Sequence, residues 1–156
     1  MRGPTQPWSS VVELALRRAQ QACSLVALQC RRLKLCQSTE PCFALRVWAD
    51  VQMLVIALRQ LRRSVELAAL VPALQDGFIR ALSDFDGPLP DLWSMHSVEE
   101  HFETVPVPDI EAWDGRVFSW AGGSLNVDEA LQAAERLLAA MIGLGAANSE
   151  ALASPG

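Results

Sequence analysis

Residues 9–37 read SSVVELALRRAQQACSLVALQCRRLKLCQ, and this stretch decides the fold class of the chain. Its apolar positions recur at alternating steps of four and three residues, which is the spacing of a helix that packs along another helix. Ser10, with Glu13 three residues later, forms a capping-box pattern at its start. The sequence therefore predicts a long helix in which Cys23 and Cys30 are small core residues. The apolar stripe consists of Val12, Leu16, Ala19, Cys23, Val26, Cys30 and Leu33.

A second stretch, residues 43–70, repeats this spacing after the turn-rich linker 37–41. The short connection predicts that the two helices run antiparallel. Trp48, Val55 and Ile56 lie off the stripe and widen the apolar surface. We therefore expect this helix to be buried on two sides, inside the bundle and at the interface of a homodimer. The stripe consists of Val47, Val51, Leu54, Leu58, Leu61, Val65 and Ala68.

The remaining sequence predicts shorter elements and completes the fold class. The expected elements are helices over about 73–84, 92–104 and 127–142 and a β-hairpin over 116–125. Together with the two long helices they predict an all-α protein, an antiparallel bundle of four to five helices with a short β-hairpin. We expect a single domain over 1–156, made of a bundle over about 9–105, the hairpin and final helix over about 114–142, and a flexible tail over 143–156.

Composition and charge narrow the class of protein. Hydrophobic residues make up 51% of the chain and charged residues 20%, which excludes a disordered or low-complexity protein. The net charge of −5 is unevenly distributed, since residues 1–70 carry +6 and residues 71–156 carry −11. Two interpretations follow: attraction between the halves or between subunits, or a basic face that binds RNA or another polyanion. The acidic overall balance is unlike that of a dedicated nucleic-acid binder.

The sequence also predicts where the protein resides. The longest unbroken apolar run, residues 53–58, is far shorter than the roughly 20 residues of a membrane span, and we find no signal-peptide pattern. We therefore expect a cytoplasmic protein without membrane contact, in which the four cysteines are free thiols because no C-x-x-C pair is present. The excess of Arg over a single Lys is typical of a high-GC bacterial genome.

His96 and His101 are the two histidines of the chain and its candidate acid–base residues. Five residues at about 100° each turn the second His roughly 140° from the first, so one helix cannot direct both at a small ligand. We therefore expect no metal site, and without a phosphate-binding or nucleotide-binding motif we expect no cofactor. The two histidines and their acidic neighbours form either a solvated helix surface or a polar groove. A nucleophilic role for Cys36 or Cys42 lacks a neighbouring His.

The order of elements carries a resemblance to a known family. Two long antiparallel helices, a short helix and then a helix reading MHSVEEHF over 95–102 resemble HEPN domains, helical proteins of prokaryotic toxin, defence and RNA-processing systems. The resemblance covers about 9–105. It implies a dimer in which an Arg and a His of each protomer line a cleft, where metal-independent ribonucleases of the family cut RNA through attack of a 2′-hydroxyl.

Carried over by position, His101 matches the motif His, Ser97 matches the polar position, and His96 stands where the family has Arg. A His is charged only part of the time and lacks the bidentate fork of a guanidinium, so phosphate binding is weaker at this position. We therefore favour a non-catalytic HEPN-like dimerisation or interaction module that binds RNA or a partner protein. The predicted contact residues are Arg59, Arg62, Arg63 and Ser97.

Two alternatives remain open at this point. In the first, His96 and His101 of two protomers form a metal-independent endoribonuclease site, one as general base and one as general acid. In the second, the chain is a helical scaffold subunit without nucleic-acid contact, which its net charge of −5 favours.

Overall fold

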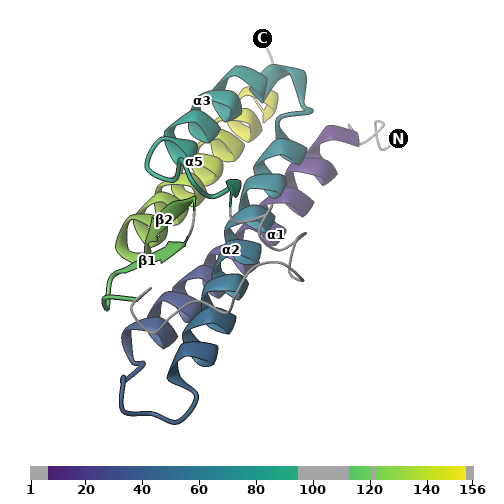
Figure 1. The fold of residues 1–156 in the computed structure, drawn as a ribbon. Coiled ribbons are helices and arrows are strands. Elements are labelled where there is room, and N and C mark those ends of the chain that lie inside the picture. The colour runs from purple at the N-terminus through teal and green to yellow at the C-terminus, as the bar shows by residue number, and fades with distance from the viewer. Residues whose placement is uncertain (1–6, 95–112, 121, 154–156) are drawn as a thin grey trace.

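The computed structural model describes residues 7–94, 113–120 and 122–153. Two long antiparallel helices, α1 (Pro7–Lys34) and α2 (Phe43–Ala68), form one half of the bundle. The other half consists of the shorter α3 (Gln75–Asp86) and the last helix, α5 (Val127–Ala153), which lie side by side (Figure 1). With a small two-stranded hairpin, this arrangement confirms the predicted all-α bundle.

The predicted stripes of α1 and α2 form the centre of the core. On α1, Ala19 and Val26 are completely buried, and on α2 the same is true of Leu54, Leu58 and Leu61. Small residues on α1 let the two helices approach closely along their whole length. Cys23 and Cys30 are buried in the same stripe, as the sequence predicts. Both helices end two or three residues earlier than their predicted ends at 70 and 37.

Helix α3 begins later than the sequence predicts, because a 3₁₀ turn over Pro72–Leu74 precedes it. Its buried face carries Phe78 and Phe85. Gly77 explains the close contact with α5, since a Cβ at this position would lie 2.7 Å from a methyl carbon of Leu144. The missing side chain of Gly77 therefore lets α3 and α5 pack together.

The hairpin consists of β1 (Val117–Trp120) and β2 (Gly123–Asn126), paired antiparallel, and confirms the hairpin predicted over 116–125. Phe118 points into the core, where its ring centroid lies 5.8 Å from that of Trp48 and 6.3 Å from that of Trp120. The assignment of Trp48 and Val55 to a dimer interface is therefore wrong, because both are buried within the single chain. Of the three residues off the stripe, Ile56 is the exposed one.

Helix α5 begins as predicted and ends later than predicted. The side-chain oxygen of Asn126 accepts hydrogen bonds from the backbone N–H groups of Asp128 and Glu129, at 2.9 and 3.2 Å. The helix continues to Ala153, so the predicted tail over 143–156 is wrong for residues 143–153. The reason is packing, because Leu144 lies against Gly77 of α3 and the backbone at Gly145 lies beside Val12 of α1.

Residues Val127–Glu150 of α5 are long and apolar enough to cross a membrane by length and composition, with a mean hydropathy of 1.2 over the best window. In the bundle, α5 packs on α1 and α3, and its buried residues include Ala130, Ala134, Leu137 and Met141. The core helix of a globular protein passes the same test when it is mostly buried, whereas 28% of this window is buried in the bundle.

Candidate interaction surface

The predicted catalytic residues lie outside the described part of the chain. His96, Ser97 and His101 all fall within residues 95–112, as does the predicted helix over 92–104 beyond Ser94. The hypothesis of a two-histidine site therefore stays a prediction from the sequence. Arg59, Arg62 and Arg63 of α2, the predicted contact arginines, lie within the described residues.

Arg62 is held by the chain's own acidic groups. Its Nε atom donates a hydrogen bond to Oδ1 of Asp86 and its Nη2 atom donates one to Oδ2, both at 2.9 Å. Arg62 also forms an ion pair with Glu66. The hydrogen bonds that Arg62 donates to Asp86 raise the pKa of Arg62 above its usual value. Because Asp86 lies at the end of α3, this bidentate contact ties α2 to α3. Arg62 thus serves the fold of the single chain.

Arg59 and Arg62 also contact an aromatic ring beyond α3. The guanidinium carbons of Arg59 and Arg62 lie 5.5 and 5.1 Å from the ring centroid of Trp93. Both distances are within the range of a cation–π interaction. These two interactions hold the turn that carries Trp93 against α2. Two of the three arginines predicted to contact RNA or a partner are therefore engaged within the chain.

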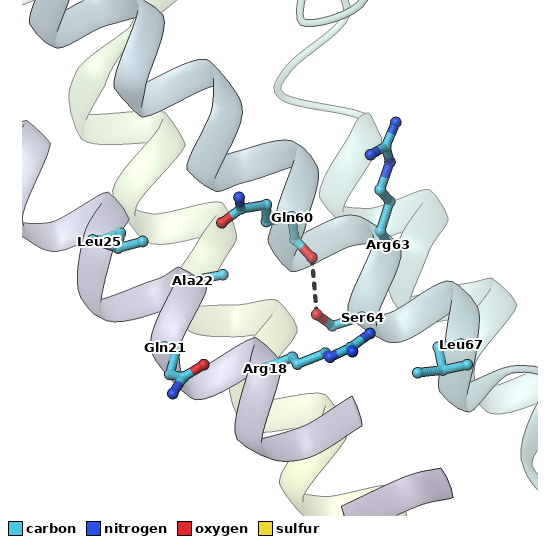
Figure 2. A pocket seen from close by; sticks show the side chains of 8 residues that line it. All are labelled: Arg18, Gln21, Ala22, Leu25, Gln60, Arg63, Ser64 and Leu67. Atoms are coloured by element: carbon cyan, nitrogen blue, oxygen red, sulfur yellow. Dashed lines mark hydrogen bonds between the residues drawn. The ribbon is translucent and has the colours of Figure 1, made fainter. Parts of the chain in front are cut away.

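Arg63 faces a different side of α2, where it lines a groove between α1 and α2. The groove has a volume of about 440 Å³. Figure 2 shows Arg18 extending from α1 towards Ser64 and Leu67 on α2, whereas Arg63 points away from Arg18. The Ser64 hydroxyl donates to the carbonyl oxygen of Gln60 at 2.9 Å, so its proton is bound within α2. The lining residues are Arg18, Gln21, Ala22, Leu25, Gln60, Arg63, Ser64 and Leu67.

The groove is part of a longer face, here called the outer face, on which each helix carries a second stripe. These stripes have the same alternating spacing as the buried ones, and they contain several large apolar side chains exposed to solvent. The outer face consists of Leu14, Arg18, Gln21, Leu25 and Leu28 of α1 and Met53, Ile56, Gln60, Arg63 and Leu67 of α2. Of these residues, the sequence alone pointed to Ile56 and Arg63, because polar side chains interrupt both stripes, although their four-and-three spacing was a usable signal.

Charge differs between the two ends of the outer face. At the groove, neither Arg18 nor Arg63 forms an ion pair within the described residues, and no carboxylate is among the described residues that line it. Near the α1–α2 turn, Arg32 donates a 2.8 Å hydrogen bond to Asp50, and Arg46 pairs with Glu40. The groove end therefore carries unpaired cations, whereas at the turn end the carboxylates are already paired and basic residues still outnumber them, four (Arg31, Arg32, Lys34 and Arg46) to three (Glu40, Asp50 and Asp128).

The described cysteines and acidic residues are spread over the bundle and do not gather as metal ligands. In residues 7–94, 113–120 and 122–153, no three His, Cys, Asp or Glu side chains gather to hold a metal ion. Burial raises the pKa of the Cys30 thiol to about 12, so this group stays protonated at neutral pH. Cys36 is half-buried with a raised pKa, whereas Cys42 is exposed.

This difference in burial predicts an order of thiol reactivity. Under native conditions at pH 8, iodoacetamide should alkylate Cys42 first and leave Cys30 unmodified until urea unfolds the chain, since the thiolate is the reactive form and Cys30 is neither ionised nor accessible. Peptide mass spectrometry at successive times measures the order. Equal rates at Cys30 and Cys42 would contradict the packing of α1 against α5.

Comparison with known proteins identifies no family and no similar protein. A scan against protein-family models matches no family, and searches of curated proteins and of solved structures find no significant match.

Proposed function

We propose that the chain is a non-catalytic, HEPN-like helical interaction module that forms a homodimer through its outer face. The observation that carries this proposal is the second stripe on α1 and α2, in which six of ten side chains are large and apolar and which has the spacing of a packed helix pair but faces solvent. Contiguous exposed apolar patches on a folded protein mark interaction sites. Two helical hairpins that pair through such faces form an intermolecular four-helix bundle.

A protein partner is favoured over RNA by the positions of the arginines. Of the three proposed for RNA contact, Arg62 is held by Asp86 and Glu66, and both Arg59 and Arg62 lie against Trp93. Phosphate binding requires cations that are available to replace counterions, and Arg62 is already neutralised within the chain. The net charge of −5 also opposes the approach of a polyanion.

The oligomeric state tests the proposal. We expect the wild-type protein to sediment at micromolar concentration with about twice the 17.0 kDa mass of the chain. Ile56→Glu should raise the dimer dissociation constant at least about tenfold, because a two-fold interface would bury the added charge in both copies. Analytical ultracentrifugation over a concentration series measures both quantities.

Ile79→Glu is the matched control. Ile79 lies on α3, away from the outer face, and at 52% exposure it is more exposed than Ile56 at 37%. This variant should dimerise like the wild type. A wild-type protein that stays monomeric at micromolar concentration, or equal weakening by both variants, would overturn the proposal.

A further inference from the structure

The ten residues of the outer face form five pairs across α1 and α2, and the two members of each pair have the same chemical character. Near the turn, Arg32 of α1 contacts Asp50 of α2. Fourteen residues away along each antiparallel helix, Arg18 extends towards Ser64 (Figure 2). In the direction of the turn, the pairs are apolar, cationic, amide, apolar and apolar. They consist of Leu14 with Leu67, Arg18 with Arg63, Gln21 with Gln60, Leu25 with Ile56, and Leu28 with Met53.

The order of the pairs has the dimensions of one amphipathic helix. Successive pairs are three or four residues apart, which is about one helical turn, so residues 14–28 of α1 span roughly 21 Å. A third helix that lies along the seam between α1 and α2 would meet one pair at each of its own turns. Its apolar residues would cover side chains that are exposed in the single chain, and this is the usual way in which a groove binds a helix.

The cationic pair decides the charge of such a helix. Arg18 and Arg63 are exposed and form no ion pair within the described residues, and no carboxylate is among the described residues that line the groove. Their side chains point away from each other (Figure 2), so each guanidinium is open to a carboxylate of its own. Consecutive residues of a helix point about 100° apart, so two neighbouring acidic residues can reach one guanidinium on either side of the seam.

We propose that the outer face binds an acidic amphipathic helix of a partner protein, an inference that rests on the outer face being the interaction surface proposed above. Two neighbouring carboxylates of the helix contact Arg18 and Arg63. One and two turns further along, apolar side chains of the helix pack on the exposed pairs of Leu25 with Ile56 and of Leu28 with Met53. The apolar contacts supply affinity, and the two ion pairs fix the direction and register of the helix.

A second copy of the chain covers the apolar pairs but cannot supply these carboxylates. Its own outer face carries the same two arginines and no acidic residue. Asp50 and Glu40 near the α1–α2 turn are already paired with Arg32 and Arg46. The acidic helix therefore binds in preference to the second copy and competes with the homodimer for the same surface.

Two synthetic peptides test the proposal. The first is an amphipathic helix of about 18 residues, with leucines opposite the apolar pairs and two neighbouring glutamates opposite the cationic pair. The second has lysines in place of the two glutamates. The protein carries a fluorophore on the exposed Cys42 and is kept at nanomolar concentration, and microscale thermophoresis measures both dissociation constants. We expect the glutamate peptide to bind at least about tenfold more tightly at low ionic strength.

Reversal of both arginines gives the decisive readout. Arg18→Glu combined with Arg63→Glu should invert the preference, so that the lysine peptide binds more tightly than the glutamate peptide. Arg80→Glu combined with Arg136→Glu is the matched control, because both arginines are exposed on α3 and α5, off the outer face, and the net charge changes by the same amount. This control should keep the preference of the wild type.

The outcomes separate the acidic helix from the homodimer and from RNA. A preference for the glutamate peptide that inverts only when Arg18 and Arg63 are reversed supports the acidic helix. Equal binding of the two peptides, binding of neither, or inversion in the control variant overturns it. Single-stranded oligouridine that displaces the glutamate peptide and binds more tightly overturns it in favour of RNA. A wild type that stays monomeric yet prefers the glutamate peptide overturns the homodimer alone.

Discussion

Replacing Phe118 by alanine should lower the free energy of unfolding by about 3–5 kcal/mol, the usual cost of removing a buried aromatic ring. Phe118 is 1% exposed and lies between Trp48 of α2 and Trp120 of its own strand. Its removal would leave a cavity at the point where the hairpin meets the helices. The hairpin is small, so few other contacts can replace those lost.

Urea unfolding followed by circular dichroism at 222 nm measures this effect. Ser119→Ala is the matched control, because Ser119 is the next residue on the same strand and is exposed. The control should change the free energy of unfolding by less than about 0.5 kcal/mol. An equally small change in the free energy of unfolding for Phe118→Ala would show that the hairpin does not contribute to the core.

Replacing Arg62 by alanine should destabilise the protein by about 2 kcal/mol, because it breaks a bidentate, charge-assisted contact between α2 and α3 and leaves Asp86 without its partner. Arg62→Lys should recover little of this loss, since a lysine ammonium cannot bind both carboxylate oxygens in the same plane. A double-mutant cycle with Asp86→Ala should show that the two substitutions together cost less than the sum of each alone.

Arg63→Ala provides the control for this cycle. Arg63 is the next residue on α2, is exposed, and has no ion-pair partner among the described residues. Its removal should leave the unfolding transition close to that of the wild type. Equal destabilisation by Arg62→Ala and Arg63→Ala would show that the contact with Asp86 does not hold α3 in place.

The sequence predicted correctly those parts of the fold in which the spacing of apolar and polar residues along one segment shows which side of it is buried. The stripe from Val12 to Leu33 has one periodicity and one buried face, so spacing alone identified the helix and its core side. Gly122 and Gly123 likewise marked the turn of the hairpin. Local pattern was sufficient wherever a residue's neighbours along the chain decide its conformation.

The predictions from the sequence were wrong where contacts with segments distant along the chain determine burial, helix ends or ion pairs. Trp48 was assigned to a dimer interface because its partner, Phe118, lies 70 residues away and the spacing within α2 carries no sign of it. Gly143 and Gly145 signal the end of a helix in isolation, yet Leu144 packs on α3 and Gly145 lies beside α1, and α5 continues to Ala153. Arg62 was taken as a surface contact residue because Asp86, which binds it through both carboxylate oxygens, belongs to another helix.

The contact of α5 with α1 has a consequence for the order in which the chain can fold. The Cys30 thiol donates to the backbone carbonyl of Val127, and Lys34 pairs with Asp128, so these contacts join segments more than 90 residues apart. The α1–α2 hairpin needs only local contacts, whereas the side of α1 that α5 covers must wait for the last helix to be synthesised. During translation the chain therefore carries an uncovered apolar surface until α5 leaves the ribosome, which makes closure by α5 a late and concerted step.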